Sequence, residues 1–150
     1  MGYISGFGTG FAALILALAA SPVAAATGAP VDVDISGVRN ARGAILVCLT
    51  ADPKAYPDCG RDPKSRKLSI PARPSDTARF DNVPPGTYAI ALIHDENSNT
   101  KMDLAVFLPK EGFGMSRNPK IGFGPPKFKS AQFSVGADPV RLPITMRYMF

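Results

Sequence analysis

Alternation of apolar and polar positions is the dominant pattern along this chain. Residues 31–35 and 77–81 alternate strictly, which is the period of a half-buried β-strand. Residues 44–49 and 87–93 are apolar on both faces, which indicates strands in the middle of a sheet. About seven segments read as short strands: residues 31–35, 44–49, 67–70, 77–81, 87–93, 131–135 and 140–148.

The strand pattern predicts an all-β fold. No helix of ordinary length is expected after residue 26, and Gly, Pro, Asn and Asp cluster between the predicted strands. Residues 67–70 lie between prolines and are expected at a sheet edge. We therefore predict a single antiparallel β-sandwich of about seven strands over residues 31–150.

Residues 94–127 have neither a strand period nor a helix period, apart from room for one helical turn at 104–108. A loop of this length is unusual in a compact domain and is commonly functional. We expect five side chains to anchor it to the sandwich: His94, Phe107, Glu111, Phe113 and Asn118.

The N-terminal segment predicts export. Residues 11–20 are an apolar run of signal-peptide length, and Ala24, Ala25 and Ala26 offer a cleavage site. We predict a signal peptide over residues 1–26 and a linker over 27–30, although residues 1–10 hold no Lys or Arg. The alternative is a retained membrane anchor. No later segment is apolar enough to span a membrane, so we expect no transmembrane span in the mature chain.

The formal net charge is +5, with Lys and Arg concentrated in residues 64–67 and 110–129. An exported protein rarely meets nucleic acid, so no nucleic-acid partner is expected. The charge fits a solvated surface or weak attraction to anionic lipid or polysaccharide. A protein, a polysaccharide or a small ligand remain open as partners.

The two cysteines, Cys48 and Cys59, are predicted to form a disulfide. An isolated pair in an oxidising compartment usually does so, and it would contribute roughly 3 kcal/mol on the chain-entropy estimate. A zinc site would need more Cys or His nearby, and the only histidine is His94.

A calcium site is predicted directly after the strand at 87–93. Side chains with oxygen atoms occupy positions 1, 3, 5 and 9 of a loop, and position 7 would supply a backbone carbonyl. Thr100 stands at position 6, where an EF-hand needs Gly, and Val106 at position 12, where it needs Glu. The alternative is a tight turn in which these side chains bond their own backbone. The predicted ligands are Asp95, Asn97, Asn99, Lys101 and Asp103.

His94 allows an enzymatic interpretation. It would act as a general base oriented by Asp95 or Glu111, with Ser98 or Ser116 as the nucleophile. Neither serine lies in a nucleophile-elbow pattern. The alternative is a histidine that only fixes the long loop to the sandwich, which we prefer.

Four stretches together resemble the bacterial domain-of-unknown-function family 2141. They are residues 38–43 (VRNARG), 80–90 (FDNVPPGTYAI), 94–103 (HDENSNTKMD) and 109–118 (PKEGFGMSRN). The resemblance implies an exported, Ig-like or prealbumin-like sandwich and implies no activity. It also places the mature protein in the periplasm of a two-membrane bacterium, with the extracellular space as the alternative. The chain departs from the family pattern at Thr100, where the family typically has Gly, and at residues 104–106, where polar residues are common.

We therefore expect a non-enzymatic binding or accessory module, without a catalytic site, that presents the 94–127 loop to a partner. Calcium is the one cofactor expected, holding the 94–103 segment. A small periplasmic hydrolase using His94 with Asp95 or Glu111 is one alternative. A structural protein of the cell envelope is the other, and it would need exposed edges suited to strand addition.

Overall fold

The computed structural model describes residues 2, 6, 27–105, 108–122, 124 and 126–150. Phe107 and nearly all of the predicted signal peptide lie outside these residues. The elements are β1 (Ala29–Ser36), β2 (Ala44–Thr50), η1 (Cys59–Arg61), β3 (Arg66–Pro71), β4 (Asp76–Val83), β5 (Gly86–Asp95), β6 (Leu104–Ala105), β7 (Leu108–Pro109), β8 (Gly112–Met115), α1 (Phe128–Ala131), β9 (Phe133–Val135) and β10 (Val140–Thr145).

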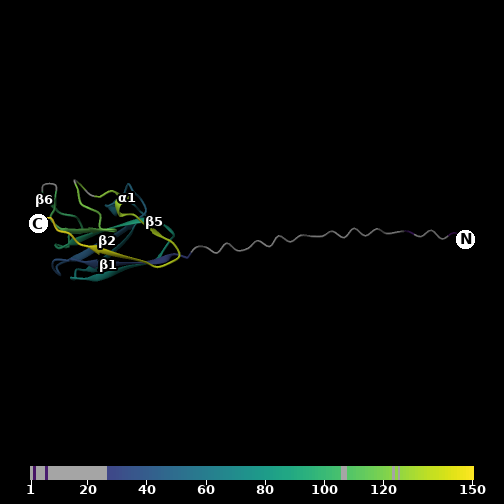
Figure 1. The fold of residues 1–150 in the computed structure, drawn as a ribbon, viewed down its shortest axis with the longest axis horizontal. Helices are drawn as coiled ribbons and strands as arrows, with labels where there is room; N and C mark the ends of the chain where they lie inside the picture. The colour runs from purple at the N-terminus through teal and green to yellow at the C-terminus, as the bar shows by residue number, and fades with distance from the viewer. Residues whose placement is uncertain (1, 3–5, 7–26, 106–107, 123, 125) are drawn as a thin grey trace.

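Two sheets face each other, so the predicted all-β sandwich is confirmed. One sheet has the order β10-β1-β4, and the other has the order β3-β2-β5-β8, with β9 pairing with β5. Figure 1 shows β1 in one layer and β2 and β5 in the other, with α1 beyond β5. As predicted, β2 and β5 are central and β3 is an edge strand.

One pairing departs from the predicted antiparallel arrangement. Strands β1 and β10 run parallel, with Val31 opposite Val140. The first and last strands of the domain meet here, and the long chain between them allows either direction. Pro143 is tolerated in β10 because this strand lies at the sheet edge.

The main core lies between the two sheets. Val31, Val33 and Ile35 point inward from β1, as the alternation predicted, and pack in one cluster with Leu49 of β2 and Ile90 of β5. Burial of such side chains contributes about 25 cal/mol per Å² of apolar surface removed from water.

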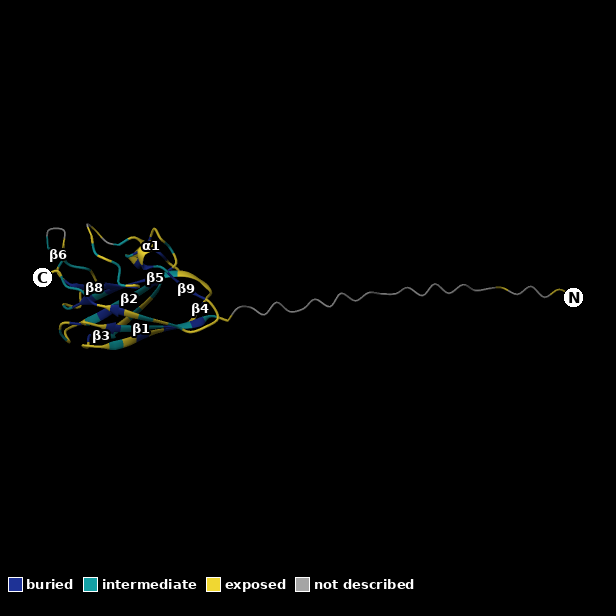
Figure 2. Ribbon diagram, in the orientation of Figure 1, coloured by how far each residue is buried: buried dark blue, intermediate teal, exposed yellow. Residues whose placement is uncertain are grey.

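A second apolar cluster covers the outer face of the larger sheet. It explains why β5 is apolar on both faces, since Ile90 faces the main core while Ala89 and Ala91 face this cluster. Figure 2 shows β5 largely buried, with α1 lying over it. The buried members are Tyr56, Ala89, Ala91, Phe113, Met115 and Ala131.

The segment 94–127 is more regular than predicted. Residues 112–115 form β8, which pairs with β5 and places Gly112 opposite His94. Gly112 and Gly114 point toward the main core, where a Cβ on Gly112 would lie 2.2 Å from Tyr148 Cε1. A strand normally shows apolar side chains on its inner face, and here both inner positions are glycine. The sequence of this strand therefore lacks the alternating pattern and looks like a loop.

Three smaller predictions also need correction. The helical turn at 104–108 is wrong, because Leu104 pairs with Pro109 in a short hairpin of β6 and β7. The strand predicted from residue 131 begins at Phe133, since Ala131 ends α1. His94 and Asp95 belong to β5 and not to the loop.

The predicted disulfide is formed and ties an excursion to the sheet. Cys48 lies on β2 and Cys59 opens η1, with 6.1 Å between their Cα atoms. Nearby, the Thr50 hydroxyl donates a hydrogen bond of 2.6 Å to the buried Asp62 carboxylate. These two links hold residues 51–62 against β2. In the part of the chain that the structure describes, no helix is long and apolar enough to cross a membrane.

Candidate functional site

The candidate site begins where β5 ends. Asp95 is buried, and its carboxylate accepts two backbone hydrogen bonds, from Asn99 N (3.0 Å) and Thr100 N (2.8 Å). The side chain therefore closes a turn over residues 95–100, as Asp and Asn side chains often do.

The other predicted calcium ligands gather around the same turn. Asp103 accepts from the side-chain amides of Asn97 (2.6 Å) and Asn99 (3.0 Å). Lys101 contributes its backbone N–H, which donates to Asn99 Oδ1 at 2.8 Å. The structure thus brings together the side chains of Asp95, Asn97, Asn99 and Asp103, with Lys101 beside them.

These contacts form a complete hydrogen-bonded turn. A calcium ion would need the Asn97 and Asn99 amides to rotate, so that each presents its oxygen in place of its N–H₂ group. The donor set, two carboxylates and two amides, consists of hard oxygens that suit calcium. Among the described residues, no three His, Cys, Asp or Glu side chains are grouped closely enough to hold a metal ion.

The backbone at Thr100 has the conformation that favours glycine, the residue that an EF-hand has at this position. Thr100 has φ +63° and Ser98 has φ +60°, both in the left-handed region. Glycine takes this region without strain, and a β-branched residue does so at a cost. Position 6 of the loop therefore has the conformation for which Gly is favoured, although the side chain is Thr.

Glu111 fastens the turn to the sandwich. Its buried carboxylate accepts from the backbone N–H groups of Glu96 (3.3 Å) and Asp103 (3.2 Å). Burial raises the pKa of Glu111, and the nearby charges of Asp103 and Asp95 act in the same direction. One side chain, from the residue just before β8, therefore holds both ends of the 96–103 segment.

His94 is fully buried at the end of β5. Its Nε2 lies 2.8 Å from the Arg42 carbonyl, which can only accept, so Nε2 carries the proton. In the neutral ring Nδ1 then accepts from the Tyr148 hydroxyl at 2.8 Å. The Tyr148 oxygen also accepts from Arg39 N–H at 3.1 Å. His94 thus links β5 to the 37–43 turn and to the C-terminal segment.

Arg39 adds an ion pair beside this network. Its Nε lies 2.5 Å from Glu96 Oε1, and its guanidinium stacks 4.5 Å above the Tyr148 ring. The hydrogen bond from Arg39 lowers the pKa of Glu96. Sequence reasoning missed Arg39, Arg42 and Tyr148, since they lie more than fifty residues from their partners and no local pattern marks them.

The serines proposed as nucleophiles do not join His94. The buried Ser116 hydroxyl donates to the Ala131 carbonyl at 2.5 Å and accepts from Ile90 N at 2.9 Å. Gly112 pairs with His94, so Ser116 lies four residues, or roughly 13 Å, further along the strand. Ser98 is exposed on the turn.

The remaining anchors lie where β8 meets β10. Phe113 is buried in the second apolar cluster. Asn118 donates to the Pro143 carbonyl (3.0 Å) and accepts from Thr145 N (2.9 Å), which joins the turn after β8 to β10.

The hairpin of β6 and β7 exposes apolar side chains. Leu104 is 56% exposed and Leu108 is 46% exposed. The C-terminal Phe150, 66% exposed, lies at the same end of the molecule (Figure 1). Lys101 and Lys110 flank the hairpin and are exposed.

A family profile matches residues 33–142 of this chain, and the family is described as "Uncharacterized protein conserved in bacteria (DUF2141)". The matched range contains β2 to β9, the turn over 95–103 and the exposed hairpin. No curated protein and no solved structure matches the chain.

Proposed function

This chain belongs to the DUF2141 family of uncharacterized bacterial proteins, and we propose that it is an exported, non-enzymatic binding module. Its contact surface is the exposed hairpin of β6 and β7. Leu104 and Leu108 support this proposal, because both are large apolar side chains left about half exposed on one short hairpin, and burial against a partner would remove that apolar surface from water.

The way in which the hairpin is held supports a binding role. Asp103 precedes β6, and its backbone N–H is held by the Glu111 carboxylate, while its carbonyl accepts from Lys110 N at 2.9 Å. Both ends of the hairpin are therefore fastened to β5 and β8. A rigid presentation of this kind lowers the entropy that is lost on binding.

The surroundings of His94 support a non-catalytic role. Both ring nitrogens are engaged with protein groups and the side chain is fully buried, which leaves no room for a substrate. Export is proposed from the predicted signal peptide, and the disulfide is consistent with an oxidising compartment.

A site-specific photo-crosslinking experiment tests the binding proposal. A photoreactive residue at position 104 is expected to yield a defined adduct in the periplasmic fraction of the bacterium that encodes the protein. The same residue at position 69, exposed on β3, is the matched control and should yield none. The proposal fails if neither position gives an adduct, or if both give the same products.

Calcium is proposed to stiffen the 95–103 turn. A cation that binds only the folded state must raise the melting temperature by mass action. We expect millimolar calcium to raise the melting temperature of the mature protein by a few degrees, and a chelator to reverse the shift. Asp103→Asn, which removes one carboxylate, should abolish it. An unchanged melting temperature in the wild-type protein would rule out the metal.

A further inference from the structure

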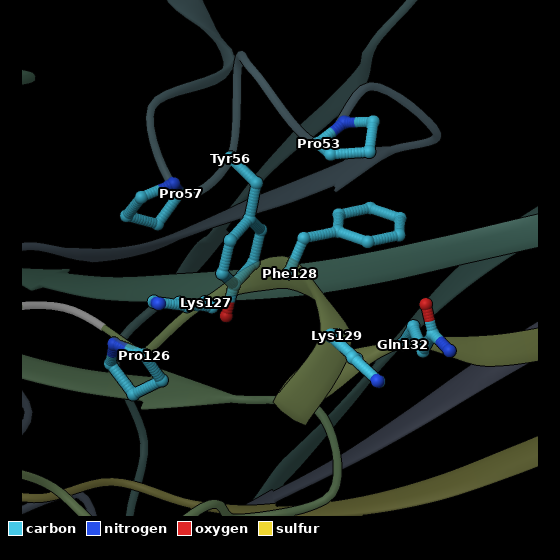
Figure 3. A pocket seen from close by; sticks show the side chains of 8 residues that line it. All are labelled: Pro53, Tyr56, Pro57, Pro126, Lys127, Phe128, Lys129 and Gln132. Atoms are coloured by element: carbon cyan, nitrogen blue, oxygen red, sulfur yellow. The ribbon is translucent and has the colours of Figure 1, made fainter.

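A groove lies on the outer side of the larger sheet, away from the hairpin. The 51–59 excursion forms one wall and the start of α1 forms the other, and between them they leave an open groove of about 700 Å³. Figure 3 shows the side chains that line it. This volume falls within the range of sites that bind drug-sized molecules.

The walls of the groove are mostly apolar rings. Pro53, Pro57 and Pro126 contribute pyrrolidine rings, while Tyr56 and Phe128 pack edge to face with centroids 5.9 Å apart. The disulfide at Cys59 holds the excursion against β2. This wall is therefore held in place before a ligand binds, which lowers the free energy that binding would spend on ordering it.

The Tyr56 hydroxyl lacks a hydrogen-bond partner among the described residues. The Tyr56 side chain is only 8% exposed, and its oxygen is buried. Figure 3 shows the hydroxyl at the far end of the ring, directed toward Lys127 and the start of α1. Buried polar groups are nearly always paired, so an unpaired donor beneath the wall of the groove points to a partner atom that the free protein lacks. Burial raises the pKa of Tyr56, so the hydroxyl stays protonated and can donate.

The mouth of the groove is positively charged. Lys127 and Lys129 line it, both are exposed, and no carboxylate is among the lining residues. Neither lysine takes part in an ion pair within the described part of the chain. Two unpaired ammonium groups beside apolar walls favour a ligand with an acidic head and an apolar body.

We propose that this groove binds a small amphipathic carboxylate. Its carboxylate group pairs with the Lys127 ammonium group and accepts a hydrogen bond from the Tyr56 hydroxyl, while Lys129, which points the other way in Figure 3, adds positive charge to the rim. The flexible Lys127 side chain moves aside to admit it. Its acyl or aromatic body packs against Pro53, Pro57 and Phe128. This site is separate from the hairpin surface, and its binding does not depend on the partner proposed there.

Displacement of the fluorescent anion 8-anilinonaphthalene-1-sulfonate from the mature, disulfide-bonded protein tests the proposal. The dye should bind saturably. Decanoate should displace it, while decyltrimethylammonium, which has the same chain and the opposite charge, should not. Absence of saturable binding, or equal displacement by both amphiphiles, would overturn the proposal.

Variants assign the binding to the groove. Lys127→Ala with Lys129→Ala should weaken decanoate binding about tenfold or more. Lys64→Ala with Lys67→Ala removes the same charge from an exposed surface elsewhere and should leave it unchanged. Equal losses of decanoate affinity in the two double variants would show that net charge alone causes the effect, and would contradict binding in the groove.

Tyr56→Phe separates the ligand role from a structural role. Its hydroxyl has no partner in the free protein, so the variant should keep or raise the melting temperature while decanoate binding weakens several-fold. A variant that loses thermal stability but binds decanoate normally would contradict the assignment of Tyr56.

Discussion

At the scale of single residues, the Tyr148 hydroxyl joins three distant parts of the chain. It donates to His94 Nδ1 and accepts from Arg39 N–H. Tyr148→Phe leaves both groups without this partner, and we expect a loss of about 1–3 kcal/mol in the free energy of unfolding, measured by urea denaturation.

Tyr88→Phe is the matched control for this substitution. Within the described part of the chain, the Tyr88 hydroxyl donates only to the Pro84 carbonyl, in an exposed turn where water can replace it. The control should therefore lose less stability. Equal losses in the two variants would show that the His94 network adds nothing beyond one ordinary hydrogen bond.

Also at this scale, Glu96 should make the stability depend on pH. The Arg39 hydrogen bond lowers the folded-state pKa of Glu96 below its usual 4.5. The ionised carboxylate therefore stabilises the fold at pH values above its unfolded-state pKa. This contribution is lost as the pH falls through the folded-state pKa. We expect Glu96→Gln to be less stable by about 0.5–1 kcal/mol at neutral pH.

The difference between wild type and Glu96→Gln should shrink as the pH falls through the lowered folded-state pKa of Glu96, because the carboxylate is then protonated. Urea denaturation of both proteins at pH 7 and at a series of pH values below the usual 4.5 follows this difference, because the other titrating groups are common to the two. A difference that stays constant across this range would contradict the ion pair as its cause. Glu111 should have the opposite effect on the pH dependence of stability: burial raises its folded-state pKa, so its ionisation at higher pH destabilises the fold.

At the scale of elements, β8 depends on glycine for close packing. Its inner face meets Tyr148 at Gly112 and Ile144 at Gly114, where an added Cβ would lie 2.2 Å and 2.9 Å from side-chain carbons. Gly112→Ala must push Tyr148 away from His94 or bend the strand. We expect a loss of about 1–3 kcal/mol from overpacking.

Gly136→Ala provides the control for β8. A Cβ at Gly136 would meet nothing within 4 Å, so this variant should show little or no loss. Thermal unfolding of both variants and of the wild type measures the two losses of stability. A harmless Gly112→Ala would mean that β8 does not pack as closely as described.

At the scale of the whole molecule, the disulfide holds the second apolar cluster in place. It closes the chain between Cys48 and Cys59, and Tyr56 from this segment packs over the larger sheet. We expect Cys48→Ala with Cys59→Ala to lower the free energy of unfolding by about 2–3 kcal/mol. Groove binding should weaken as well, because one wall is released.

Reduction of the wild-type protein supplies an independent measurement of the same quantity. The described residues include no free cysteine, so a reductant should act only on this bond. The reduced wild type should unfold at the same urea concentration as the double variant. If reduction has no effect on stability, the disulfide does not hold the excursion.

The sequence by itself determined most strands of the two large sheets and which of them are central. Alternation marked β1 and β4, and apolar residues on both faces marked β2 and β5 as central, because burial dictates residue type at each position. The disulfide was also predictable, since the chain has only two cysteines. These features depend on local composition and need no knowledge of distant contacts.

Only the tertiary structure decided what packs against these strands. Strand β8 could not be predicted, because its inner positions are Gly112 and Gly114. Glycine is required there by close contact with Tyr148 and Ile144, which lie some thirty residues further along the chain. The partners of His94 and the groove at Tyr56 are likewise formed by segments far apart in sequence. A local pattern records which side chains are buried, whereas a site depends on which distant segments the fold brings together.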